Sequence, residues 1–420
     1  MADYIKQVTV TGDVSTITDN AGLIEDWCYE VEKEITEQKP EFAIIHIQGL
    51  KAASDPDGLA QKIIKCLFHD SNELQQQFRA SRAFFDTRDT GLGSIYLFRD
   101  NNEVESFDRY SNTGYKNLPA GHKHDIGSRE SDGFIANTFN TASSSQVGSL
   151  RYEGDFYRSS RNEPEAKSDE QVTGYLMSRF RIYGRDFTFV NLCLYTVPFE
   201  DVNELIEQDS SLMFQPEVTK AAATRQKQID MLLKEIESEG LKDDSILAAG
   251  AFNAQLFETH LLSDMADTQG AKSYAKRTPE GTLAGIEQRD RHGRSLVTVE
   301  THRFDLHSIH DWFFRLGRGQ MVKKYNGELG QVSFCGKLLE ESVFFQPSRH
   351  YGISSETGKE EFMKNLCPAW ADRVLYNEKL NDLFRHDSFC ASGLYYGLVG
   401  EKKFIGQHKP VALHATICLK

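Results

Sequence analysis

The chain is organised around Cys367-Pro368-Ala369-Trp370-Ala371-Asp372-Arg373-Val374-Leu375, which has a later counterpart in Gly406-Gln407-His408-Lys409-Pro410-Val411. In both stretches an acid or an imidazole stands at a turn against an apolar strand, an arrangement typical of the edge of a phosphate site. Each has a simpler interpretation when taken alone. Asp372-Arg373 is often a local ion pair at a strand start, and His408 is often a rim histidine with its own hydrogen-bond partner.

The composition is that of a globular chain. Hydrophobic residues make up 39% of the 420 residues, with 27 Phe and 16 Tyr, which is enough for a sizeable core. The length allows two average domains or one large sandwich. A net charge of −14 argues against a surface built for nucleic acid or for an anionic membrane, although it leaves room for a local basic pocket that takes a small polyanion.

Cysteine usage and hydropathy bear on the compartment. The seven cysteines are odd in number and lack metal-ligand spacing, which favours a reduced intracellular protein over a disulfide framework. The first residues show no basic region followed by an apolar one, and no apolar run approaches the length of a membrane span. We therefore expect a cytoplasmic protein with no integral membrane segment.

Taken together, the two opening stretches resemble the Pro-Ala/Ser-Trp-Cys-Asp-Arg and Asp-His-Lys-Pro-Val signatures of inositol polyphosphate 5-phosphatases, in the endonuclease/exonuclease/phosphatase (DNase I-like) superfamily. The resemblance covers nearly the whole chain and is closest to the type I enzymes, which hydrolyse soluble inositol phosphates. It implies an α/β fold, a four-layer sandwich of two mainly antiparallel sheets packed face to face with helices outside. It also implies a single domain over 1–420.

Periodicity agrees with such a fold. Apolar residues recur at helical spacing over 23–35 and 229–236, and residues 42–47 form an apolar run of strand length. Residues 111–171 are rich in Ser, Asn, Gly and Arg, and we expect an irregular connection there. Residues 272–303 carry both charges, with a basic bias, and we expect a solvated loop; a loop that contacts a polyanion is the alternative.

The resemblance assigns catalytic positions that this sequence has changed. The family's principal magnesium ligand is a Glu, and Gly49 stands there. The family's base is an Asp and its phosphate-binding residue a His, and Ala251 and Cys193 stand at those positions. Two further changes replace a site acid and an Arg with Gln407 and Gln255. A lone Cys on a strand is usually a small buried hydrophobe rather than a nucleophile.

Part of the family's constellation is retained. By the resemblance, Asp372 and His408 are the pair in which an Asp holds a His that grips the phosphate, and Asn253 orients phosphate and water. The candidate phosphate contacts are Arg373, Lys409, Arg179 and Arg349, the last of which follows a Phe-Pro-Pro-Ser/Thr-like segment at 343–348. Asp13 is a weak candidate for holding metal. Type I relatives typically end in a prenylation box, but Cys418 is third from the end, so we expect no prenyl anchor.

Three functions remain open. General base catalysis contributes about 10²–10⁴-fold, and no neighbour of Ala251 in sequence offers a substitute, so the first is an inactive homologue that binds a protein partner. The second is a binder or sensor of inositol polyphosphate. The third is a residual 5-phosphatase that uses Asp13 and Asp372 for magnesium. We expect no cofactor, apart from magnesium in the third case.

Overall fold

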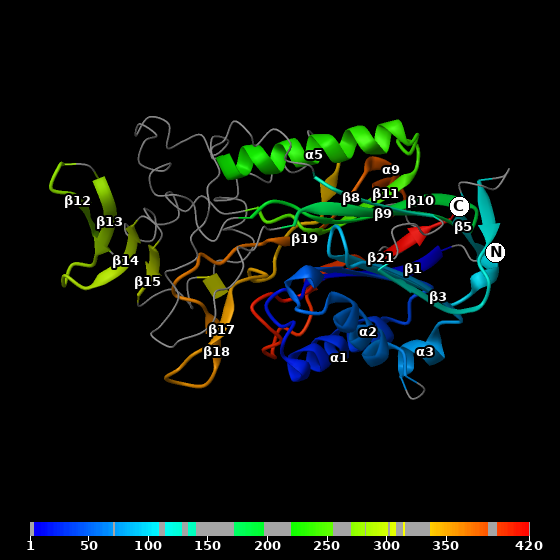
Figure 1. Ribbon diagram of the computed structural model, residues 1–420, viewed down its shortest axis with the longest axis horizontal. Coiled ribbons are helices and arrows are strands. Elements are labelled where there is room, and N and C mark those ends of the chain that lie inside the picture. Colours follow the sequence, from blue (N-terminus) through cyan, green and yellow to red (C-terminus); the bar gives the residue numbers. More distant parts are fainter. Residues whose placement is uncertain are drawn as a thin grey trace.

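The first sheet joins both ends of the chain. The computed structural model describes residues 4–69, 72–108, 114–127, 133–139, 172–196, 220–254, 270–281, 283–300, 303–307, 314–315, 337–384 and 393–419. The strand order is β20-β21-β1-β2-β4-β3-β7. The bounds are β1 (Tyr4–Asp13), β2 (Phe42–Gln48), β3 (Ala80–Asp86), β4 (Leu92–Phe98), β7 (Gly121–Ile126), β20 (Tyr395–Leu398) and β21 (Val411–Cys418). Figure 1 accordingly shows the two termini at the same end of the molecule.

The second sheet is built from the middle of the chain. Its order is β16-β19-β11-β10-β9-β5-β6, and β8 also pairs with β9. The bounds are β5 (Val104–Phe107), β6 (Tyr115–Asn117), β8 (Phe134–Thr138), β9 (Gly174–Ile182), β10 (Arg185–Cys193), β11 (Ser245–Ala251), β16 (Leu339–Glu340) and β19 (Asp372–Tyr376). Most neighbours are antiparallel, but β1–β2, β3–β7 and β10–β11 are parallel pairs. Both sheets are therefore mixed.

Strand alternation gives each sheet two apolar faces. In β2, Phe42 and Ile44 belong to the core between the sheets, whereas Ala43 and Ile45 belong to the core under the helices. Helices α1 (Ala21–Gln38), α2 (Pro56–Leu67) and α3 (Glu73–Gln77) cover the first sheet, and α5 (Lys220–Ser238) covers the second (Figure 1). The predicted four-layer sandwich with outer helices is confirmed.

Local signals define the outer helices. The side chain of Asn20 accepts a hydrogen bond from the Leu23 amide at the start of α1, and Lys39 ends the helix in a left-handed conformation just before Pro40. The side chain of Asp55 likewise caps α2, with Pro56 in its first turn. Short elements complete the chain: the 3-10 turns η1 (Leu50–Ala52) and η2 (Asn101–Glu103), helix α9 (Glu378–Phe384), and the hairpin β17 (Tyr351–Ile353) and β18 (Glu360–Phe362).

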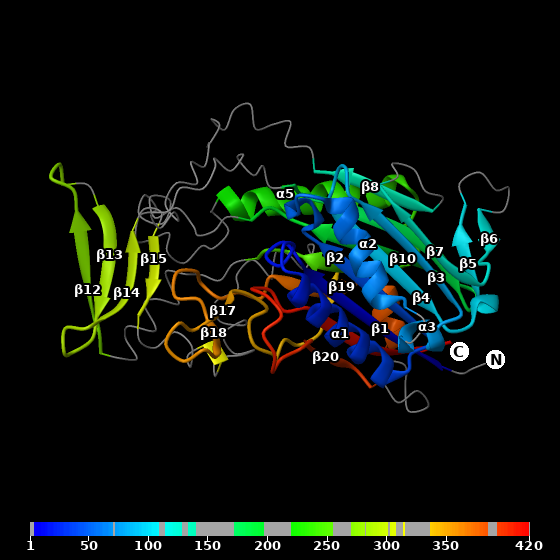
Figure 2. The ribbon, with the colours of Figure 1, turned by 60° about the horizontal axis from the view of Figure 1, so that its bottom comes forward.

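Two connections differ from the sequence expectation. The described parts of 111–171 contribute β6, β7 and β8 to the sheets, so the prediction of an irregular connection is wrong there, and residues 140–171 lie outside the described residues. The predicted loop at 272–303 is a four-stranded antiparallel sheet of β12 (Lys272–Arg277), β13 (Leu283–Arg289), β14 (Ser295–Glu300) and β15 (Arg303–Leu306). Figure 2 shows this sheet at one end of the molecule, where its residues Leu296, Val297 and Leu306 share a buried cluster with Trp370 and Val411.

The thiols and the helices bear on the compartment. Cys28, Cys66, Cys193 and Cys367 are free thiols, whereas Cys418 is disulfide-bonded, so the expectation of reduced cysteines is wrong for Cys418. Within the described part of the chain, no helix has the length and apolar character needed to cross a membrane.

Candidate functional site

Strand register brings several of the predicted positions to one end of the sandwich. In the second sheet, Cys193 at the end of β10 pairs with Ala251 at the end of β11, and Ala251 pairs with Asp372 at the start of β19. In the first sheet, Asp13 ends β1 opposite Gln48, which ends β2 and directly precedes Gly49. The pKa of Cys193 responds to the charges of both Asp13 and Asp372, so the two sheets meet at this point.

Asp372 and His408 form a buried pair at the centre of this site. Nδ1 of His408 lies 3.8 Å from Oδ2 of Asp372, and their side chains are 8% and 0% exposed. Within the described residues, three buried atoms of this pair have no hydrogen-bond partner: Oδ1 and Oδ2 of Asp372 and Nδ1 of His408. Burial lowers the pKa of His408, but the carboxylates of Asp13 and Asp372 outweigh it and raise this pKa above its ordinary value.

Ser348 joins the two signature stretches to each other. Its hydroxyl oxygen accepts hydrogen bonds from the backbone amides of Ala371 and Asp372, each at 3.1 Å. Its carbonyl oxygen accepts from the Lys409 amide at 2.7 Å. Sequence reasoning noted the segment 343–348 but assigned no role to its serine. The family-like Pro-Ser ending of that segment is the signal that points to this residue.

Asn253 and Arg349 interact with each other rather than with an open cleft. Asn253 adopts a left-handed conformation with φ 55°, and its amide donates to the Leu194 carbonyl at 2.7 Å. Its side-chain oxygen accepts from Arg349 Nη1 at 2.7 Å, and the same nitrogen donates to Thr196 Oγ1 at 3.4 Å. Both the nitrogen and the oxygen of the Asn253 side chain therefore have protein partners.

The backbone at Gly49 leaves no room for the family's metal ligand. Gly49 has φ 82°, and a Cβ atom there would lie 2.5 Å from Oδ1 of Asp13 and 2.7 Å from the amide of Ser15. That same oxygen of Asp13 accepts a hydrogen bond from the Ser15 amide at 2.7 Å, which fixes the carboxylate in place. A glutamate at this position would have to displace Asp13.

The positions of the base and of the phosphate histidine have become apolar. Ala251 and Cys193 pack in one buried cluster with Phe84, Leu92 and Leu176. Burial, reinforced by the charges of Asp13 and Asp372, raises the pKa of the Cys193 thiol far above its ordinary value. The thiol is therefore neutral at physiological pH and serves as a small hydrophobe, as expected from its place on a strand.

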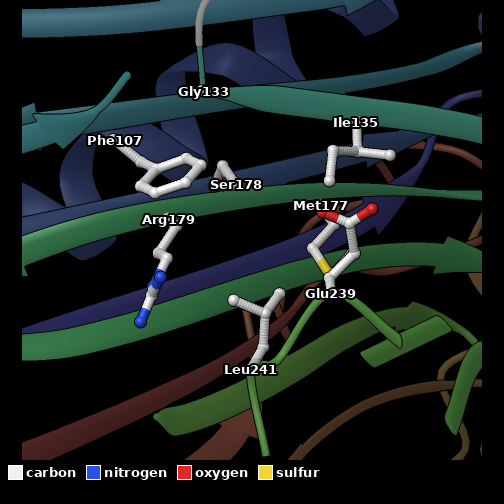
Figure 3. A pocket seen from close by; sticks show the side chains of 8 residues that line it. All are labelled: Phe107, Gly133, Ile135, Met177, Ser178, Arg179, Glu239 and Leu241. Carbon is white, nitrogen blue, oxygen red and sulfur yellow. The ribbon is translucent and has the colours of Figure 1, made fainter. Parts of the chain in front are cut away.

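Two of the four predicted phosphate contacts point elsewhere. Asp372 faces the core between the sheets, so alternation turns Arg373 to the opposite face, where it is fully buried and pairs with Glu340 at 2.7 Å. Arg179 lies farther along β9, beside Phe107 and Met177 (Figure 3), and its guanidinium pairs with Asp244 at 2.6 Å. The site does not include either arginine.

Lys409 serves the loop that carries His408. Its Nζ donates to the carbonyls of Gly400, Glu401 and Lys403 at 2.9, 2.9 and 3.0 Å, and pairs with Glu360 at 2.9 Å. Its side chain is 0% exposed, so it holds the loop together rather than reaching a ligand. Gln407 packs nearby, with its backbone amide donating to Thr16 Oγ1 at 3.3 Å, and Gln255 lies outside the described residues.

The residues present do not fit the magnesium site that the family uses. The described residues contain no group of three or more His, Cys, Asp or Glu side chains placed to hold a metal ion. Position 49 supplies no carboxylate, and the raised pKa of His408 favours a positive charge beside Asp13 and Asp372. A cation there would compete with the imidazolium for the same two carboxylates.

Comparison with known proteins agrees with the resemblance. The chain is 23% identical over 415 residues to human inositol polyphosphate-5-phosphatase A, covering 96% of this chain and 91% of that protein. It is 23% identical over 282 residues to a probable type I inositol 1,4,5-trisphosphate 5-phosphatase of Caenorhabditis elegans, covering 58% of this chain and 62% of that one. No family model matches the chain.

Two solved structures complete the comparison. The 5-phosphatase domain of SPsynaptojanin, solved with inositol (1,4)-bisphosphate and calcium, aligns with TM-score 0.48 and 11% identity over 99% of this chain and 84% of that one. A Cimex nitrophorin variant aligns with TM-score 0.45 and 12% identity over the whole of both chains. The sequence similarity to the inositol polyphosphate 5-phosphatases therefore spans nearly the whole length of this chain.

Proposed function

We propose that this chain is a catalytically inactive homologue of the type I inositol polyphosphate 5-phosphatases and that it acts by binding a protein partner. The observation that carries the inactivity is the backbone at Gly49. The space in which the family's metal ligand would begin is filled by Asp13, at 2.5 Å from the position of a Cβ atom. Restoring a glutamate at position 49 would therefore not rebuild the metal site by itself, because the Asp13 carboxylate occupies the space that its side chain needs.

The chemistry of the remaining positions supports the same proposal. Hydrolysis of a phosphate ester needs charge stabilisation at the phosphate and a base for the attacking water. Ala251 and Cys193 offer neither, because one lacks a proton acceptor and the other is a neutral buried thiol. The acids that remain, Asp13 and Asp372, raise the pKa of His408 and are engaged with it.

The first experiment is phosphate release from inositol 1,4,5-trisphosphate at near-stoichiometric protein with magnesium, beside an Asp372→Ala control. We expect no release above the control. Magnesium-dependent release that disappears in Asp372→Ala would mean that the site has been rebuilt for catalysis, and the proposal of inactivity would be wrong.

A calorimetric titration with the same inositol phosphate separates inactivity from ligand binding. Arg373, Lys409 and Arg179 are all engaged by carboxylates or carbonyls of the chain, so we expect no measurable heat. Binding that is lost in Arg349→Gln would replace the protein-binding proposal with that of an inositol polyphosphate sensor.

The four-stranded sheet of β12 to β15 at one end of the molecule, here called the projecting sheet, is the surface that favours a protein partner. Among the described residues, strand β12 pairs with β13 alone and so forms an edge, and five of its six residues are exposed, including Tyr274 at 48%. An unpaired edge offers backbone donors and acceptors to an added strand, and its lysines keep it from self-association. A partner that adds a strand beside β12 fits this geometry.

A photo-crosslinking residue at position 274 tests this surface directly. Tyr395, 50% exposed on the sandwich, provides the matched position. We expect a discrete adduct from position 274 with a partner in the protein's own cellular extract and none from position 395. Equal labelling from both positions, or none from 274, would remove the edge strand from the proposal.

A further inference from the structure

A second pair of reactive side chains lies outside the site described above. Cys28 on α1 and Cys66 on α2 both line a cavity of about 590 Å³, which also receives Glu25, Lys62 and Lys65. These helices cover the outer face of the first sheet (Figure 2), and neither Asp372 nor His408 lines the cavity. The cavity is therefore separate from the vestigial site, and nothing said of it depends on whether that site is active.

Helix packing holds the two thiols against each other. Cys28 is 2% exposed and belongs to the core under α1, while Cys66 is only partly buried and packs against the same core. Both thiols are free, and they lie close enough that each shifts the pKa of the other. One sulfur is therefore open to the cavity, and the second stands directly behind it.

The surroundings of the pair shift the pKa values of the two thiols in opposite directions. The hydrogen bond from Cys28 lowers the pKa of Cys66 to about 7 against the opposing effects of burial and of Glu25, with help from Lys62 and Lys65. The same hydrogen bond, together with burial, raises the pKa of Cys28 well above its ordinary value. At pH 7 about half of Cys66 is the thiolate, and Cys28 is the thiol that stabilises it.

We propose that Cys66 and Cys28 form a thiol–disulfide exchange site for small disulfides, in which Cys66 attacks and Cys28 resolves. The size of the cavity suits a ligand of several hundred Å³, and its lining carries both charges, with Lys62 and Lys65 beside Glu25 and Glu32. Lys62 is partly neutralised by Glu25 at 3.8 Å, which leaves Lys65 as the more effective charge.

The exchange proceeds in two balanced steps. The Cys66 thiolate attacks one sulfur of the small disulfide, a mixed disulfide forms at Cys66, and one small thiolate leaves. Cys28 then loses its proton to water in the cavity and attacks the Cys66 sulfur, so that the Cys28–Cys66 bond forms and the second small thiolate leaves. The two protein thiols are oxidised by two electrons, and the small disulfide is reduced to two thiols.

Oxidised glutathione is the probe that tests the exchange on the full chain. Mass spectrometry of digests should show a peptide pair linked through Cys28 and Cys66 in the wild type. Cys28→Ala should instead stop at a glutathione adduct on Cys66. The buried thiol of Cys367, 8% exposed, is the internal control and should stay unmodified. A wild type that keeps the adduct without resolving it, or that reacts no faster at Cys66 than at Cys367, overturns the proposal.

Alkylation by iodoacetamide measures the thiolate independently of resolution. A pKa of about 7 instead of 9.0 gives roughly 50-fold more thiolate at pH 7, and the lower intrinsic nucleophilicity removes roughly tenfold of that. We therefore expect Cys28→Ala to slow alkylation of Cys66 about fivefold at pH 7. At pH 10, where Cys66 is ionised in both proteins, the variant should react roughly tenfold faster, because only the difference in nucleophilicity remains. An unchanged rate at pH 7 in a folded Cys28→Ala protein also overturns the proposal.

Discussion

Buried polar groups in the core between the two sheets are hydrogen-bonded at its centre but, among the described residues, incompletely so at its end. At the centre, Gln48 Nε2 donates to Asn191 Oδ1 at 2.6 Å and to Thr11 Oγ1 at 3.1 Å. The Asn191 amide in turn donates to the carbonyls of Ile47 and Gly93 at 3.1 and 2.8 Å. At the end, Asp372 is equally buried, but neither of its carboxylate oxygens has a hydrogen-bond partner in the described part of the chain.

Two histidines show the same difference. His46, at the centre, is fully buried; burial lowers its pKa to about 3, against a weaker effect of the Ala249 carbonyl. His408, at the end, has a raised pKa because two carboxylates outweigh burial. The centre excludes charge and satisfies its dipoles, as a core built for stability does. The end retains charges whose hydrogen bonds are incomplete, which is the signature of an inherited site rather than of packing.

The largest expected effect separates a structural lysine from a ligand-binding one. Lys409→Met removes the ammonium, itself fully buried, that satisfies three carbonyls, and leaves Glu360 with Arg315 at 3.8 Å as its remaining cation. Breaking a buried pair on one side costs about 3–5 kcal/mol, and urea unfolding measures it. The exposed Lys402→Met is the control and should be near neutral. A Lys409→Met protein as stable as the wild type would return Lys409 to the list of candidate ligand contacts.

The centre of the core is tested by Asn191→Leu. The substitution leaves the Ile47 and Gly93 carbonyls and the Gln48 amide without their partner. Unsatisfied buried groups of this kind cost about 2–3 kcal/mol together, and loss of urea stability is the measurement. Asn102→Leu, at an exposed position, is the comparison. If Asn191→Leu were neutral, the centre would not owe its stability to the satisfied network.

Gly49 tests whether the end of the core has closed around its lost metal ligand. Gly49→Ala places a Cβ atom at φ 82° and against Asp13, whereas Gly281→Ala meets the same backbone strain at φ 88° with nothing within 4 Å. The strain alone costs about 1–2 kcal/mol, so Gly281→Ala should lose that much and Gly49→Ala more. Adding Asp13→Ala to Gly49→Ala should reduce the difference without removing it, because the contact of 2.7 Å with the Ser15 amide remains. An equal loss at both glycines would mean that Asp13 and Ser15 yield easily.

Sequence reasoning reached the site through strand ends. The apolar runs at 42–47 and 246–249 are long and regular, so the strands, and with them the meeting of Cys193, Ala251 and Asp372, followed from pattern and resemblance. The projecting sheet was missed because β12 is exposed on both faces and shows no apolar alternation. Nothing in such a sequence distinguishes an edge strand from a solvated loop.

The errors among the cations have a common physical cause. Arg373 follows Asp372 on a strand, so the two side chains had to face opposite sides, and only one of them could enter the site. Lys409 was misjudged because its partners are backbone carbonyls, which sequence does not reveal. A charged residue in a signature motif helps to identify the motif, but the direction in which its side chain points depends on the surrounding strand and loop.

The smallest expected effect is the pH dependence of stability that His408 contributes, and its direction follows from the raised pKa. Because the folded pKa of His408 lies above its unfolded value, its contribution to stability is fully present below pH 6.5 and is lost as the pH rises through the folded pKa. Asp372→Asn removes one of the two carboxylates that raise this pKa and also the carboxylate with incomplete hydrogen bonds. At pH 9 we expect a change within about 1 kcal/mol in either direction, since the lost carboxylate was poorly satisfied.

At pH 6 the same variant should be less stable than the wild type, because the imidazolium then loses its partner at 3.8 Å. Urea unfolding from pH 6 to 9 measures the difference, and His408→Gln should abolish the pH-dependent part altogether. A difference that is constant with pH would mean that His408 stays neutral when folded. The imidazole at the end of the core would then exclude charge as the imidazole at its centre does, and the Asp372 carboxylate would owe nothing to a charged histidine.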